Sequence, residues 1–83
     1  MTYAQIKAAW TEAQTAGPAF YSKFEAATGL SQETVTTLFG RWNRLSFAET
    51  EGIAARHGTT LREGGFQAYL AEVYSSANSG CSQ

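Results

Sequence analysis

Side chains with catalytic potential are few in this chain, and they stand far apart in the sequence. His57 has no nearby cysteine or aspartate with which to form a nucleophile–base pair, and the chain contains no aspartate at all. Glu49 and Glu51 are two residues apart, so they face different directions on a helix and do not form a simple acid–base pair. Cys81 is the single cysteine, which leaves no disulfide framework and no paired zinc ligand. We therefore expect a protein that is not an enzyme and that uses no metal and no cofactor.

The elements that position the remaining polar side chains are predicted to be helices. No stretch of five or more residues alternates with a period of two, as a half-buried strand would. Thr2 and Gln5 have the spacing of a capping box at the start of a first helix, and Gly17-Pro18 separates that helix from a second. The sequence therefore predicts an all-α fold, a small bundle of four to five short helices that contains a helix-turn-helix.

The second half of the chain gives two further helices. Ser46 and Glu49 have capping-box spacing and predict a fourth helix that ends at Gly58. The residues of this helix expected to face the core are Phe47, Ile53 and Ala54. A last helix, regular from Phe66, carries the strongest amphipathic pattern of the chain. We expect a single helical domain over residues 1–75 and a flexible polar tail over residues 76–83.

The turn at Gly29 is the most strongly specified feature of the sequence. Glycine suits the left-handed position after a helix, and Ser31 is placed to cap the helix that follows.

Gly40 lies away from the apolar stripe of that helix and costs about 1 kcal/mol relative to alanine. It either permits a close approach to this face or is simply tolerated. The apolar stripe expected to face the core is Val35, Leu38, Phe39, Trp42 and Leu45.

Residues 26–35, with the pattern A-x-T-G-L-S-x-x-T-V, resemble the helix-turn-helix of bacterial and phage transcription regulators. The matching positions are Gly29, Leu30, Ser31, Val35 and, at the next buried position, Leu38. One position departs from the family pattern, which prefers a small residue four before the glycine, where the two helices touch. Glu25 stands there, and we expect it to be buried or to push the helices apart.

This resemblance implies a small regulator from a phage or a mobile element, whose helix 32–45 enters the major groove of duplex DNA. Gln32 could then pair with adenine, and Glu33 could accept a hydrogen bond from cytosine. Thr36 and Thr37 could reach a phosphate or a thymine methyl group. Arginines further along the helix would hold phosphates. The DNA-binding residues implied in this way are Ser31, Gln32, Thr36, Thr37, Arg41, Arg44 and Lys23.

Charge and aromatic content favour an alternative, a small protein-binding module or inhibitor. The net charge is −1, with four basic and three acidic residues in 1–45 and two basic and four acidic residues in the remainder. Proteins that bind nucleic acid usually carry an excess of lysine and arginine. Five Phe, four Tyr and two Trp are more rings than so small a core needs. The candidates for an exposed aromatic patch are Tyr21, Trp42 and Tyr74.

Neither a signal peptide nor a membrane span is expected from the sequence. The N-terminus lacks a basic segment followed by an apolar run, and no stretch approaches the ~20 apolar residues that a bilayer crossing needs. We therefore expect a cytoplasmic protein whose partner is duplex DNA or a host protein. A core of 83 residues supplies little net stability, so a homodimer is a further expectation.

Overall fold

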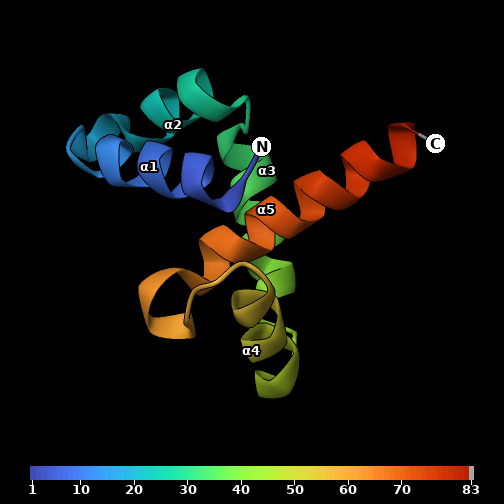
Figure 1. The fold of residues 1–83 in the computed structure, drawn as a ribbon. Helices are drawn as coiled ribbons and strands as arrows, with labels where there is room; N and C mark the ends of the chain where they lie inside the picture. Colours follow the sequence, from blue (N-terminus) through green and yellow to red (C-terminus); the bar gives the residue numbers. More distant parts are fainter. Residues whose placement is uncertain (83) are drawn as a thin grey trace.

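The computed structural model describes the backbone of residues 1–82 and the side chains of residues 1–74. This part of the chain contains five α-helices, one short 3-10 helix and no strand, so the predicted all-α class is confirmed (Figure 1). The side chains of the predicted polar tail, residues 76–83, lie outside the described part. The elements are α1 (Tyr3–Gln14), η1 (Gly17–Ala19), α2 (Phe20–Thr28), α3 (Gln32–Trp42), α4 (Phe47–Arg56) and α5 (Leu61–Ser82).

Hydroxyl side chains fix the starts of three helices. The capping boxes of Thr2 with Gln5 and of Ser46 with Glu49 are both complete, as predicted. Ser31 accepts a hydrogen bond from the Thr34 N–H at 3.2 Å and so caps α3. Hydrogen bonds from the backbone and side chain of Ser46 hold the pKa of Glu49 below its ordinary value.

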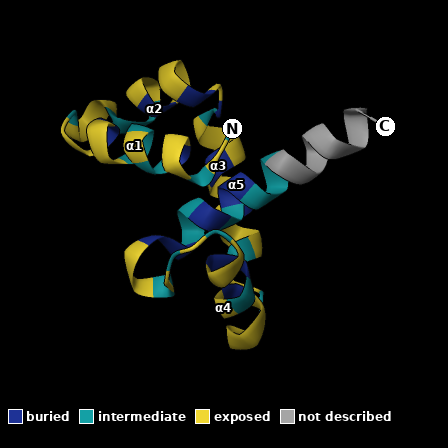
Figure 2. Cartoon of the chain, viewed as in Figure 1, coloured by how far each residue is buried: buried dark blue, intermediate teal, exposed yellow. Residues whose placement is uncertain are grey.

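The core lies where α1, α2, α3 and α5 meet, and the middle of α5 runs through it (Figure 2). Phe24 of α2 is fully buried there. Trp10 packs edge-on against Phe24, with 5.4 Å between the ring centroids, and edge-on against Phe20 at 4.9 Å. The buried members of this cluster are Ile6, Ala13, Phe24, Leu30, Val35, Leu38, Leu70 and Ala71.

Helix α4 lies apart from α1 and α2 and packs on α5 (Figure 1). Ile53 and Ala54 are buried, as predicted, but Phe47 is 69% exposed, so its predicted place in the core is wrong. The reason is its position at the first residue of α4, directly after the Ser46 cap. The side chains that α4 buries come from its second half and from Thr50, so its first residue lies at the surface.

Two glycines let other helices come close to α5. Gly64 interrupts the regular helix, and a Cβ there would overlap the hydroxyl of Tyr3. That hydroxyl donates a hydrogen bond to the Thr59 side chain at 3.0 Å, which links α1 to the α4–α5 connection. A Cβ on Gly65 would lie 3.0 Å from the ring of Trp42, so α3 also depends on a glycine for its fit against α5.

An ion pair joins the end of α4 to α5. The Arg56 guanidinium donates through Nε to Oε1 of Glu72 at 2.8 Å and through a second nitrogen to Oε2. His57 Nε2 lies 3.4 Å from the same carboxylate. These groups hold the pKa of Glu72 below its ordinary value, and the largest cause is the hydrogen bond from Arg56.

Because the pKa of Glu72 is lower in the folded state, its ionisation stabilises the fold above the ordinary glutamate pKa of about 4.3 and loses that effect as the pH falls further. We expect Glu72→Gln to lower the melting temperature by a few degrees at neutral pH and hardly at all at pH values of about 3. Thermal unfolding of both proteins across this range measures the difference. A difference in melting temperature that stays constant with pH would show that the ionisation of Glu72 does not contribute to stability.

Candidate nucleic-acid interface

A tight turn joins α2 to α3 at the predicted glycine. Gly29 has a φ of 80°, in the left-handed region, and its N–H donates to the carbonyl of Glu25 at 2.7 Å. Thr28 then stabilises the turn, because its hydroxyl donates to the Phe24 carbonyl and accepts from the Leu30 N–H. Both helix ends are therefore fixed by local hydrogen bonds.

Buried side chains on both sides of the turn hold α3 in place. Phe24 and Thr28 come from α2, and Leu30 comes from the turn itself. Val35 and Leu38 are the buried residues of α3, as the apolar stripe predicted. Helix α3 is therefore anchored through one narrow edge, and the rest of its surface faces away from the core.

Glu25 does not enter the contact between the two helices. It was expected to be buried or to force the helices apart, yet its side chain is exposed. The residues of α2 that face inward are Phe24 and Thr28, one turn apart, and Glu25 lies beside that line on the solvent side. The departure from the family pattern therefore leaves no buried carboxylate.

Most of α3 is open to solvent. Phe39 was predicted to face the core, but it is 49% exposed. One part of its ring packs edge-on against Phe66, with 5.2 Å between centroids. The prediction failed because Phe39 lies at the border of the stripe, where Phe66 of α5 covers only part of its ring. The exposed residues of α3 are Gln32, Glu33, Thr34, Thr36, Thr37, Phe39, Gly40 and Arg41.

Four residues form an outward line along α3 and its C-terminal extension. Glu33, Thr37 and Gly40 follow the helical spacing i, i+4 and i+7. The fourth residue, Arg44, lies in the turn after α3, because the helix predicted to run to residue 45 ends at Trp42, where Asn43 caps it. A Cβ built on Gly40 would meet no atom within 4 Å. The packing of the described chain therefore does not require glycine at this position, and the helix backbone is open to an approaching molecule.

The cations predicted to bind phosphate divide into two groups. Arg41 and Arg44 are exposed and make no salt bridge with any side chain that the structure describes. Lys23 instead lies 3.7 Å from the carboxylate of Glu12 on α1. Lys7, also on α1, donates to the backbone carbonyl of Glu63. The two arginines therefore accompany α3, whereas both lysines are engaged elsewhere.

The hydroxyl groups of α3 are partly used within the helix. Ser31 caps the N-terminus, and the Thr36 hydroxyl donates to the carbonyls of Gln32 and Glu33 at 3.0 and 3.1 Å. Thr37 and the amide of Gln32 are exposed. Of the predicted base-reading residues, Gln32 and Thr37 therefore offer the polar groups that are free to contact a ligand.

The aromatic residues proposed for a protein interface are half-buried. Tyr21 packs edge-on against Phe20, and Trp42 packs at a tilt against Tyr69, each with centroids within 5.4 Å. Tyr74 packs against the core. The exposed large apolar side chains of the described chain are instead Phe39 and Phe47, which the sequence had assigned to the core. Phe39 lies at the border of an apolar stripe, and Phe47 is the first residue of a helix. These two positions could have indicated their exposure.

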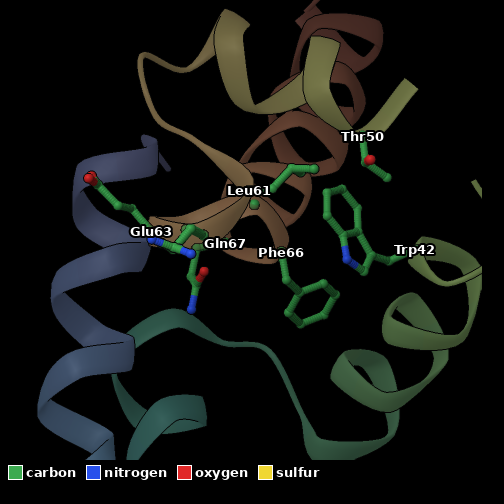
Figure 3. A pocket seen from close by; sticks show the side chains of 9 residues that line it. Trp42, Thr50, Leu61, Glu63, Phe66 and Gln67 are labelled. Carbon is green, nitrogen blue, oxygen red and sulfur yellow. The ribbon is translucent and has the colours of Figure 1, made fainter. Parts of the chain in front are cut away.

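A pocket of about 360 Å³ lies beside Trp42, at the start of α5. Figure 3 shows the rings of Trp42 and Phe66 on one side of it and the side chains of Glu63 and Gln67 on the other. Thr50 also lines it, but its hydroxyl already donates to the Phe47 carbonyl. Arg62 also lines the pocket, so its aromatic wall faces charged and amide side chains that could contact a polar ligand.

No protein-family model matches this chain, and neither a curated protein nor a solved structure with significant similarity to it was found. Among the described residues, no helix combines the length and the apolar character that crossing a membrane requires. The same residues contain no cluster of three or more histidine, cysteine or acidic side chains arranged to hold a metal ion.

Proposed function

We propose that this protein binds duplex DNA by placing α3 in the major groove. The observation that carries the proposal is the outward line of α3, whose residues are exposed within the described part of the chain and which includes Gly40. Arg41 and Arg44 stand at the C-terminal end of this surface without carboxylate partners among the described side chains. A free helix face with cations at one end suits a groove flanked by phosphates.

In this arrangement the N-terminal part of α3 reads bases and the C-terminal part holds the backbone. The Gln32 amide pairs with adenine, and the Glu33 carboxylate accepts from the amino group of cytosine. Arg41 and Arg44 bind phosphates on either side of the groove. Two phosphate contacts per chain predict a slope of about −1.8 in log affinity against log salt.

Gly40 supports this function because it lowers stability without any benefit to the fold. Glycine inside an exposed helix costs about 1 kcal/mol relative to alanine, and nothing in the described chain occupies the space beside it. A ligand that must approach the helix backbone closely would account for this cost. The sugar–phosphate backbone beside a helix in the major groove is such a ligand.

Gly40→Ala should therefore separate stability from binding. We expect it to raise the free energy of unfolding by about 1 kcal/mol, because alanine is the better helix former. We also expect it to weaken duplex binding about 5- to 30-fold, because the methyl group has to be accommodated in a close interface. Urea denaturation measures the first effect, and fluorescence anisotropy with a labelled random duplex at low salt measures the second.

Gly52→Ala is the matched control for this experiment. Gly52 lies inside α4, and a Cβ there would make an ordinary contact with Arg56 at 3.6 Å. This variant should gain similar stability and bind DNA like the parent. If the parent does not bind duplex at low salt, or if both variants bind as the parent does, α3 is not a DNA-binding helix.

A second candidate function is a protein-binding module that uses the aromatic side of α3. The specific observation is the half-exposed ring of Phe39, which packs edge-on against Phe66 next to the pocket lined by Trp42. Partly exposed aromatic side chains beside a hollow are typical anchors of protein interfaces. A host protein retained by the immobilised chain after nuclease digestion of the lysate would support this function.

A further inference from the structure

An apolar groove lies between α4 and the start of α5, and none of the described side chains fills it. Its apolar lining comes from Phe47, Ala54, Ala55 and Leu61. The groove measures about 660 Å³, which is ample for a large apolar side chain. The full lining is Phe47, Glu51, Ala54, Ala55, Thr59, Thr60, Leu61 and Arg62.

Phe47 has no evident purpose within the described chain. It is 69% exposed, and the start of α4 is already fixed by the capping box of Ser46 and Glu49. A phenylalanine in this position leaves apolar area in water that a polar residue would not. The exposed ring forms one side of the open groove, so both are available to a neighbour.

The charges around the groove indicate which neighbour fits. Glu51 and Arg62 both line it, both are exposed, and neither forms a salt bridge with a side chain that the structure describes. A partner of a single charge sign would leave one of them unmatched, and a nucleic acid would be repelled by Glu51. A second copy of the same surface, turned by a two-fold axis, offers an arginine to the glutamate and a glutamate to the arginine.

We infer that the chain forms a symmetric homodimer through this groove. Phe47 of each copy enters the groove of the other. Glu51 of each copy pairs with Arg62 of the other, so the two-fold axis produces two such ion pairs. The interface uses residues of α4 and of its connection to α5, and none of the residues in the outward line of α3. The inference therefore goes beyond DNA binding and does not depend on it.

Sedimentation equilibrium over a wide range of protein concentration tests the dimer. The parent should approach twice the chain mass as concentration rises. Phe47→Ala should raise the dissociation constant at least about a hundredfold, because two phenylalanine rings leave the interface together. Its circular dichroism spectrum should match that of the parent, since the exposed ring contributes little to the fold. Phe39→Ala, which changes the other exposed phenylalanine, should dimerise like the parent.

Exchanging the two charged residues of the groove tests the dimer without changing the aromatic ring. Glu51→Arg and Arg62→Glu should each weaken the dimer, because each places like charges opposite one another, and the two together should restore it. A parent that remains a monomer at every concentration would overturn the inference, even if it captures another protein. The inference is equally overturned if Phe47→Ala dimerises as the parent does, or if the double exchange is no better than the single ones.

Discussion

Replacing Arg41 and Arg44 together by alanine is expected to weaken duplex binding about 60-fold at salt concentrations of about 0.1 M. Each phosphate contact adds about 0.9 to the slope of log affinity against log salt. Over the decade from about 0.1 M to 1 M salt, two contacts are therefore worth about 1.8 decades of affinity. Both side chains are exposed and free of salt bridges within the described chain, so the substitution should leave the fold intact.

The measurement is a salt series of binding isotherms for the parent and the double variant. The parent should show the steeper slope, and the variant should lose most of its salt dependence. Because neither arginine is expected to read bases, the loss should be similar for duplexes of different sequence. Circular dichroism of both proteins would confirm that helix content has not changed.

Lys7→Ala combined with Lys23→Ala provides the matched control. It also removes two positive charges, but from α1 and α2. There Lys23 pairs with Glu12, and Lys7 donates to a backbone carbonyl. We expect this variant to bind within a few-fold of the parent. A control that loses as much as the arginine variant would mean that overall charge, and not α3, governs binding.

Phe24→Ala should cost about 3–5 kcal/mol of the free energy of unfolding, the largest effect on stability that we expect of a single substitution. Phe24 is fully buried, stacks on Phe20 with 5.8 Å between centroids and packs edge-on against Trp10. A domain of this size has a total stability of about 4–12 kcal/mol. The variant should therefore lose between about a quarter and all of the stability of the fold.

Urea denaturation followed by far-ultraviolet circular dichroism measures this loss. Phe47→Ala makes the same chemical change at an exposed site, and under monomeric conditions it should alter the free energy of unfolding by no more than about 0.5 kcal/mol. Leu30, Val35 and Leu38 anchor α3 in the same core as Phe24, so Phe24→Ala should weaken duplex binding in proportion to the fraction of the protein that it unfolds. A Phe24→Ala variant with the same free energy of unfolding as the parent would contradict the core described above.

Local interactions explain why so much of the secondary structure was predictable. The cap of Ser31, the capping box of Ser46 with Glu49 and the left-handed Gly29 each involve groups three or four residues apart. Such hydrogen bonds form whenever the local chain is helical, whatever the distant residues do. For the same reason Val35 and Leu38 could be assigned to the core from their spacing alone.

The position of the candidate interface on α3 was predictable, but the partners that engage charged side chains on other helices were not. The exposure of Gln32, Thr37 and the two arginines follows from helical periodicity. The pairing of Lys23 with Glu12 on another helix does not, because it depends on how α1 and α2 pack. The contact of Tyr3 with Thr59 and the ion pair of Arg56 with Glu72 likewise join residues from different helices.

The sequence by itself therefore determined the all-α class, the main helix starts and the turn at Gly29, because these depend on neighbours along the chain. The tertiary structure decided which apolar residues at the borders of the helical stripes are buried. Phe39 and Phe47 have the side chains of core residues, yet both are exposed, because α5 covers only part of the Phe39 ring and the main packing of α4 in the described chain is against α5. A phenylalanine is buried only where another element covers it, and no local pattern specifies that element.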